Sequence, residues 1–272
     1  MIPVVDFSGY SLKGGHPTPS EAELAPLADE IHKAFIQVGL FYMKNHGLDI
    51  SQVEEYMEMA KRFFDLPLDI KKKYELEQGT SYMYQGYHLH EHCDHEGSAD
   101  DLKEAFNAYP TWEGEWPDEY VPGFKEKSLN IIKPCMELHS RLLEITALGL
   151  RWPRDTFQKY HNIGKPNHNS VRTLHYYPVP ENFTLFPGQT RCGKHTDFGS
   201  FSLLFQDDVG GLEEHRVAIA DKDNINIGAG RRSLVFFGSP DNDALVTPID
   251  CLNEEKPMKY NDYAQMKVYH AY

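Results

Sequence analysis

The segment Lys194–Ser200 reads Lys-His-Thr-Asp-Phe-Gly-Ser and guides the interpretation of this chain. His195 and Asp197 stand at positions i and i+2, so on a strand or extended segment both side chains project to the same side. A His-x-Asp pair alone is weak support for a metal site, and a second pair occurs at 92–94. The significance of the first pair therefore depends on the residues that follow it.

A further histidine follows at His215, in the segment Glu-His-Arg-Val. His195, Asp197 and His215 together make a set of two histidines and one carboxylate. Such a set binds a metal on one face and leaves positions open on the other. Imidazole with a hard carboxylate, and no thiolate, favours Fe(II) over a structural zinc ion. We therefore expect these three residues to bind iron.

Arg231 and Ser233 are also two residues apart, in the run Arg-Arg-Ser-Leu-Val-Phe-Phe. A guanidinium binds a carboxylate with two hydrogen bonds, and a serine hydroxyl can add another donor. Tyr177 could add a phenol to the same carboxylate. Taken singly, Arg231 could be a surface residue of an edge strand, and Tyr177 a core aromatic. Taken together, the three predict a site for the far carboxylate of a dicarboxylate co-substrate.

The composition is that of a globular protein. The chain has 272 residues, of which 40% are hydrophobic and 25% are charged, so it can bury a sizeable core. The net charge of -14 argues against nucleic acid or an anionic membrane as a partner. Neither a signal peptide nor a membrane-spanning apolar run is visible, and the four cysteines lack C-x-x-C spacing. We expect a cytoplasmic protein.

Helices are expected where apolar residues recur at helical spacing. The first begins at Ser20, where Glu23 completes a capping box, and ends before Gly39. The others are expected from about 51 to before Pro67, over 125–150 with a kink near Pro134, and over 155–161.

Short strands are expected mainly in the second half of the chain. They cover 2–7, 40–43, 171–177, 200–205, 212–217, 234–237 and 244–246, whereas 78–122 is expected to be rich in loops. The pattern predicts an α+β fold with a helix-rich region over 1–122. Residues 123–272 would hold the long helix, a double-stranded β-helix (jelly-roll) core and a C-terminal tail, all in one compact unit.

The order of these motifs resembles the iron(II)- and 2-oxoglutarate-dependent oxygenase superfamily, in the branch of isopenicillin N synthase and of flavonoid and gibberellin oxidases. The resemblance spans nearly the whole chain. Its segments are Ile2–Asp6, Gly39–Gly47, Asp101–Phe106, Tyr176–Pro178, His195–Asp197, Gly210–Glu213, His215–Val217, Arg231–Ser233 and Tyr260–Tyr272.

The resemblance implies a role for each candidate residue. His195, Asp197 and His215 would bind Fe(II), with no catalytic residue beyond them. Arg231, Ser233 and Tyr177 would bind 2-oxoglutarate as co-substrate. With dioxygen, such an enzyme hydroxylates or desaturates a small organic molecule. An oxidase that uses no 2-oxo acid is disfavoured by Arg231 and Ser233 but stays open.

One spacing departs from the family pattern. Asp197 and His215 are 215 − 197 = 18 positions apart, which leaves too few residues for the usual intervening strands. A hairpin returning His215 to Asp197 would reverse near Gln206, but turn residues lie at 208–211. That mismatch displaces His215 by about seven residues, or roughly 20 Å at ~3.3 Å per residue. A loose crossover over 207–214 would instead leave His215 in place.

We therefore expect a barrel that lacks one or two strands and an oxygenase activity that the short spacing between Asp197 and His215 could impair. The alternative is a non-catalytic family member that acts as a ligand-binding or interaction protein. Arg172 leaves a further choice open: it could face an acidic substrate or point outward from its strand. Residues 88–95 are rich in histidine, which suits either zinc or copper capture or a solvent-exposed loop.

Overall fold

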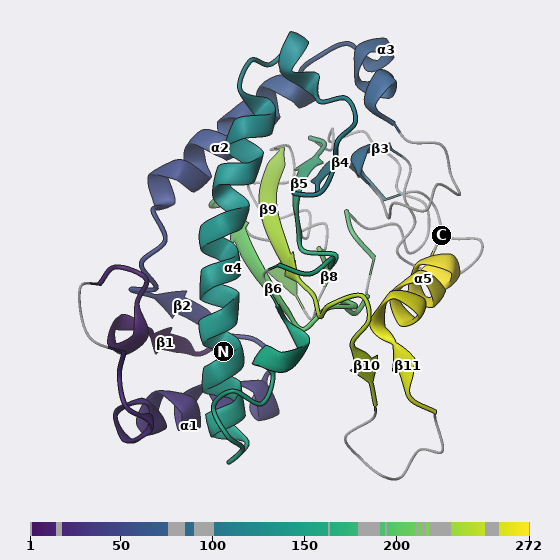
Figure 1. The fold of residues 1–272 in the computed structure, drawn as a ribbon. Helices are drawn as coiled ribbons and strands as arrows, with labels where there is room; N and C mark the ends of the chain where they lie inside the picture. The colour runs from purple at the N-terminus through teal and green to yellow at the C-terminus, as the bar shows by residue number, and fades with distance from the viewer. Residues whose placement is uncertain are drawn as a thin grey trace. The chain divides into compact units, whose positions relative to one another are not determined.

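The computed structural model describes residues 2–14, 18–75, 85–89, 101–162, 164–178, 191–193, 195–209, 212–213, 216–217, 230–247 and 256–271. The chain forms two compact units (Figure 1). Unit 1 comprises Met1–Ile50 and Lys133–Lys165, and unit 2 comprises Ser51–Ile132 and Pro166–Tyr272. Each unit takes residues from both sides of the expected boundary between 122 and 123.

Unit 1 is built around helices and a small parallel sheet. Its elements are β1 (Val4–Asp6), η1 (Ser8–Tyr10), α1 (Glu21–Gln37), β2 (Tyr42–Lys44), most of α4 (Phe124–Gly149) and η4 (Gln158–Tyr160). The start of α1 is confirmed: Ser20 caps it, and Ser20 and Glu23 form a complete capping box. Gly39 follows the helix with a φ of 82°, a conformation that glycine adopts most easily.

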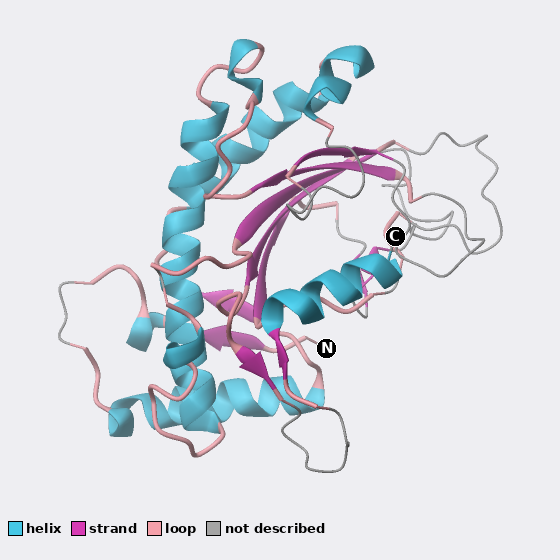
Figure 2. Cartoon of the chain, turned by 45° about the vertical axis from the view of Figure 1, so that its right-hand side comes forward, coloured by secondary structure: helices cyan, strands magenta, loops and turns pink. Residues whose placement is uncertain are grey.

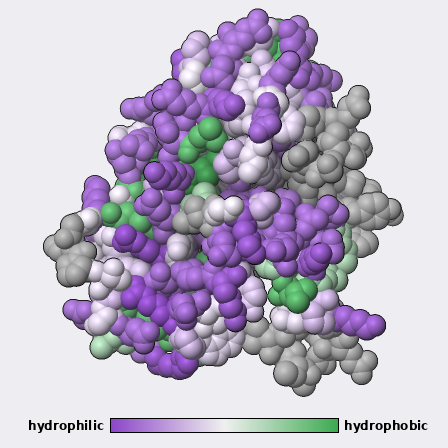
Figure 3. Space-filling view, in the orientation of Figure 1, coloured by the Kyte–Doolittle hydropathy of each residue, from purple (hydrophilic) through white to green (hydrophobic). Residues whose placement is uncertain are grey.

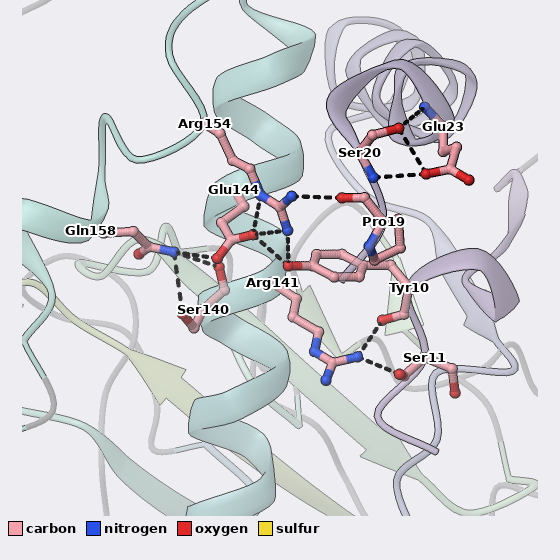
Figure 4. Close-up of polar contacts among 10 residues, drawn as sticks. All are labelled: Tyr10, Ser11, Pro19, Ser20, Glu23, Ser140, Arg141, Glu144, Arg154 and Gln158. Carbon is pink, nitrogen blue, oxygen red and sulfur yellow. Dashed lines mark hydrogen bonds and ion pairs between the residues drawn. The ribbon is translucent and has the colours of Figure 1, made fainter. Parts of the chain in front are cut away.

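A polar cluster ties the N-terminal segment of unit 1 to α4 (Figure 4). At its centre, the Glu144 carboxylate accepts hydrogen bonds from Tyr10 Oη, from Arg154 Nε at 2.6 Å and from Gln158 Nε2 at 3.1 Å. Arg154 also donates to the carbonyl oxygen of Pro19 at 2.8 Å, and Arg141 donates to that of Tyr10 at 2.9 Å. This Tyr10 cluster therefore joins four segments of unit 1.

Unit 2 is organised by an antiparallel five-stranded sheet with the order β3-β4-β5-β9-β6. Its strands are β3 (Gly86–Leu89), β4 (Lys103–Ala108), β5 (Ser170–Tyr176), β6 (Phe201–Gln206) and β9 (Arg231–Gly238). Two small antiparallel pairs are β7 (Leu212–Glu213) with β8 (Arg216–Val217) and β10 (Leu245–Val246) with β11 (Met258–Lys259). The other elements are α2 (Ile50–Phe64), α3 (Leu68–Lys71), η2 (Lys72–Tyr74), η3 (Pro117–Glu119), the first residues of α4 and α5 (Tyr260–Ala271).

The five-stranded sheet is strongly curved (Figure 2), and different side chains lie on its two faces. The core face carries Phe106, whose ring lies 5.0 Å from that of Phe63 in α2 and 4.9 Å from that of Phe124 in α4. The opposite face, here called the open face, carries both polar and apolar side chains. Strand alternation places on it Lys103, Ala105, Asn107, Arg172, Leu174, Tyr176, Ser202, Leu204, Gln206, Arg231, Ser233 and Val235.

Most expected strands and helices are confirmed within a few residues, but three expectations are wrong in kind or extent. Residues 212–217 form two short strands paired with each other, rather than one strand. Residues 155–161 form turns and a single 3₁₀ turn. The region expected to be rich in loops also contains β3 and β4, and β4 occupies an interior position of the sheet.

The surface agrees with the composition. In the view of Figure 3 the visible face is largely hydrophilic, with small separate hydrophobic patches. None of the helices in the described residues is both long and apolar enough to cross a membrane.

Candidate active site

His195 and Asp197 lie together, as the sequence predicts. His195 Nε2 is 3.6 Å from Asp197 Oδ1. Two ligand atoms that are each about 2.1 Å from one metal ion lie about 3.0–3.6 Å apart at angles of about 90–120°. The pair is thus spaced to share an ion.

Neighbouring groups orient both side chains. His195 Nδ1 lies 2.9 Å from the carbonyl oxygen of Gly193, and because that oxygen can only accept, Nδ1 must be the donor. Nε2 is then the nitrogen directed at Asp197. The hydroxyl of Ser202 donates to Asp197 Oδ2 and leaves Oδ1 facing the histidine. A ligating histidine held by a carbonyl and a ligating carboxylate held by a hydroxyl are typical of metal sites.

A buried ion pair between Asp101 and Lys103 lies next to Gly193, the residue that orients His195. Asp101 accepts a hydrogen bond from the Gly193 amide at 3.0 Å and pairs with Lys103. Both of these charged side chains are buried. Asp101 therefore holds the amide of Gly193, and the carbonyl of the same residue orients His195.

His215 lies outside the described residues, so its role stays a prediction. The strands on either side of it pair with each other, Leu212 opposite Val217 and Glu213 opposite Arg216. β6 pairs with β9 rather than with this segment. Within the described part of the chain, no group of three or more His, Cys, Asp or Glu side chains could hold a metal ion. The second pair at 92–94 and most of the histidine-rich segment also lie outside it.

Arg231 and Ser233 lie together on the open face and are buried, with Arg231 only 1% exposed. Arg231 Nη1 donates to Ser233 Oγ at 3.3 Å, and Nη2 donates to Gln206 Oε1 at 2.6 Å. The guanidinium also lies 4.8 Å from the centre of the Tyr176 ring. The sequence did not predict a role for Gln206 in this site. Its position opposite Ser233 follows from the pairing of β6 with β9.

The structure places Tyr176, rather than Tyr177, beside Arg231. Tyr176 is paired with Arg231 in the β5–β9 register, so the two side chains share a face. Burial raises the pKa of Tyr176 to about 12, so its phenol stays protonated and able to donate. The Tyr177 ring instead packs against His175 at 5.7 Å, and burial together with Glu104 raises its pKa. A contact of Tyr177 with the co-substrate stays a prediction.

A second buried arginine adds positive charge to the same region. Burial lowers the pKa of Arg191, and the nearby charge of Arg231 lowers it further, while Asp207 opposes the shift. A guanidinium whose charged form is disfavoured in this way would gain from a bound dianion. The candidate site therefore combines an oriented His195–Asp197 pair with two buried arginines.

The chain is similar in sequence and in fold to known proteins. Residues 2–127 match the family described as non-haem dioxygenase in morphine synthesis N-terminal. A 2-oxoglutarate-dependent dioxygenase of Dothideomycetidae sp., frbA, is 29% identical over 78% of this chain and 65% of its own. Another from Aspergillus rugulosus, ecdK, is 30% identical over 71% of this chain and 63% of its own. The chain thus spans less than two thirds of either relative.

The chain belongs to the Fe(II)- and 2-oxoglutarate-dependent oxygenase superfamily. The solved structure of a full-length Neurospora crassa protein in complex with alpha-KG has the same fold, with a TM-score of 0.81, 23% identity and coverage of 100% of this chain and 96% of that one. The expected α+β fold of the superfamily, with a jelly-roll core, is thereby confirmed. Members of the superfamily use Fe(II) and 2-oxoglutarate, which fit the donors found here.

Proposed function

We propose that this chain is an Fe(II)- and 2-oxoglutarate-dependent oxygenase that hydroxylates or desaturates a small organic molecule with dioxygen. One observation carries the proposal: the buried Arg231–Ser233 pair and the oriented His195–Asp197 pair belong to the same unit, and Ser202, in the sheet that carries Arg231 and Ser233, holds Asp197. The first suits a dicarboxylate, and the second suits a hard metal ion.

Each group has a distinct task. His195, Asp197 and His215 would hold Fe(II), which when bound supplies the redox chemistry that couples decarboxylation of 2-oxoglutarate to substrate oxidation. Arg231 and Ser233 would bind the distal carboxylate of 2-oxoglutarate through charge-assisted hydrogen bonds. The Tyr176 ring would pack against the guanidinium of Arg231, and Gln206 would fix its orientation through a hydrogen bond. Burial of these groups excludes water from the carboxylate.

Metal and co-substrate binding provide the first test. Isothermal titration of Mn(II), an inert substitute for Fe(II), and then of 2-oxoglutarate should give saturable binding to the wild-type chain. Asp197→Ala should weaken Mn(II) binding by more than the roughly 10–100-fold loss typical of outer-sphere substitutions. Asp94→Ala in the second His-x-Asp pair is the matched control and should leave the affinity unchanged. Equal affinities of the two variants would contradict the assignment of Asp197.

The short spacing keeps a second candidate in view, a non-catalytic member that binds ligands. It is favoured by the pairing of β7 with β8, because these strands, which flank His215 in the sequence, form a separate sheet in the described part of the chain. His215→Ala separates the candidates. In the oxygenase it should weaken Mn(II) binding and abolish succinate formation from 2-oxoglutarate with Fe(II) in air. Wild-type protein that binds 2-oxoglutarate but forms no succinate would support the non-catalytic member.

A further inference from the structure

A second polar row crosses the open face of the sheet. The strand registers align Asn107 of β4, Arg172 of β5, Val235 of β9 and Leu204 of β6. Arg172 is four residues from Tyr176 along β5, so both side chains project to the same face. Of the two orientations that the sequence leaves open, the register selects the face that also carries Arg231 and Ser233.

Asn107 is the residue of this row with an unsatisfied buried hydrogen-bond acceptor. Its side chain is buried, with 4% exposure, and Nδ2 lies 3.5 Å from His88 Nε2. Its Oδ1 is buried and accepts no hydrogen bond. Native proteins rarely bury an acceptor without a hydrogen bond, because the acceptor loses its bonds to water and gains none in return. An incoming O–H or N–H group would satisfy it.

The row lies between the two ends of the candidate active site. The preceding row contains Ser233, and the following row contains Ser202, which holds Asp197. Rows on one face are about 6.8 Å apart, and neighbouring strands about 4.8 Å. The Cα of Arg172 is therefore about 12 Å from that of Ser202, a gap that the long arginine side chain and a small bound molecule can bridge.

The chemistry of the row indicates what it binds. A guanidinium matches a carboxylate through two parallel hydrogen bonds. The positive charge of Arg172 also acts on its surroundings: burial raises the pKa of Tyr109 to about 12, and Arg172 counters part of that shift. Leu174 and Val235 on the same face offer apolar contacts to a hydrocarbon group.

We propose that Arg172 and Asn107 form the substrate subsite, and that the substrate is a small carboxylic acid with a hydroxyl or amino group next to its carboxylate. The carboxylate would bind Arg172, and the adjacent donor would bind Asn107 Oδ1. This inference rests on the proposed oxygenase function, since the row is called a substrate subsite because of its place beside the metal and co-substrate residues.

The test uses matched probes. Mandelate carries a carboxylate and an adjacent hydroxyl, phenylacetate lacks the hydroxyl, and mandelamide and phenylacetamide lack the charge. Each is titrated calorimetrically into the full chain, with and without Mn(II) and N-oxalylglycine, an inert analogue that occupies the 2-oxoglutarate site. Mandelate should bind most tightly, and the two amides should bind about 10–100-fold more weakly than the corresponding acids.

Two variants then separate the subsite from the co-substrate site. Arg172→Met should lose about 10–100-fold in affinity for both acids and keep its affinity for N-oxalylglycine. Arg231→Met should instead lose affinity for N-oxalylglycine and keep its affinity for both acids. Arg172→Lys keeps the charge without the fork and should fall between wild type and Arg172→Met. Asn107→Leu should remove only the preference for mandelate over phenylacetate.

The outcomes are distinct. Acids that bind no more tightly than their amides, or equally to wild type and Arg172→Met, would overturn the subsite. Failure of N-oxalylglycine and Mn(II) to bind wild-type protein would instead overturn the proposed function. In that case, acid binding that still depends on Arg172 would support an acid-binding site on its own.

Discussion

At the scale of single residues, the Glu104 carboxylate of unit 2 is buried and accepts three hydrogen bonds. Its side chain, 1% exposed, accepts hydrogen bonds from Lys71 Nζ at 2.6 Å, Tyr87 Oη at 2.7 Å and His175 Nδ1 at 2.9 Å. Burial raises the pKa of Glu104, but the bonds from His175, Lys71 and Tyr87 outweigh it and hold that pKa below the ordinary value. The carboxylate is therefore charged in the folded protein at neutral pH.

The lowered pKa sets the sign of a pH dependence. The unfolded chain takes up the Glu104 proton at a higher pH than the folded chain does, so this group stabilises the fold above pH ~4.5 and less as pH falls below it. Glu104→Gln should cost about 3–5 kcal/mol, because Lys71 is left buried without its anion. Urea unfolding of wild type and variant at several pH values would check this. A variant whose stability falls with acid as steeply as wild type would contradict it.

Asp101 offers a prediction on the candidate metal site. Asp101→Ala removes the acceptor of the Gly193 amide and the partner of Lys103, so the carbonyl that orients His195 should become less fixed. The Mn(II) affinity should fall by about 10–100-fold, as for other outer-sphere partners. Asp6→Ala is a control at an exposed carboxylate of unit 1. Unchanged Mn(II) affinity of Asp101→Ala by calorimetry would remove Asp101 from the support of the site.

The sequence predicts residue pairs well when they depend only on a two-residue spacing. His195 with Asp197 and Arg231 with Ser233 are neighbours in the structure for that reason. Contacts between strands were not predictable, since they depend on register. The contacts of Gln206 and Tyr176 with Arg231, and of Asp101 with Gly193, could therefore be identified only from the structure.

At the scale of elements, β4 shows where pattern recognition fails. All six of its residues are buried, so no polar–apolar alternation marks it as a strand. Lys103, Glu104 and Asn107 lie on both faces of the strand, and each charge or amide is bonded inside the fold. The prediction of one strand over 212–217 was wrong for a different reason. The whole segment is typical of a strand in sequence, but the chain reverses within it, and its two ends pair with each other.

The core contribution of β4 can be measured through Phe106. Its ring is fully buried between Phe63 and Phe124. Phe106→Ala should cost about 3–5 kcal/mol in the free energy of unfolding, from lost burial and the cavity left behind. Leu204→Ala on β6, where the side chain is 38% exposed, should cost much less. Similar losses in both variants by urea unfolding would show that β4 does not anchor the core.

At the scale of the whole molecule, the candidate site and the Tyr10 cluster belong to different compact units. Glu144→Gln weakens the bonds to Tyr10 and Arg154, both within unit 1, and should cost about 1–3 kcal/mol. Compact units often open separately, so amide exchange should speed up in α1 while β5 and β9 keep their protection. The affinity for Mn(II) and N-oxalylglycine should stay unchanged, because His195, Asp197, Arg231 and Ser233 all lie in unit 2.

A matched control for Glu144→Gln is Glu55→Gln, which removes an exposed partner of Lys127 in unit 2. An exposed pair contributes about 0–1 kcal/mol, so this variant should resemble wild type. α4 could couple the opening of unit 1 to that of unit 2, because the helix has residues up to Ile132 in unit 2 and residues from Lys133 in unit 1. If Glu144→Gln accelerates exchange in β5 and β9 as much as in α1, the helix couples the two units into one cooperative transition. Ligand binding to unit 2 would then stabilise the Tyr10 cluster as well.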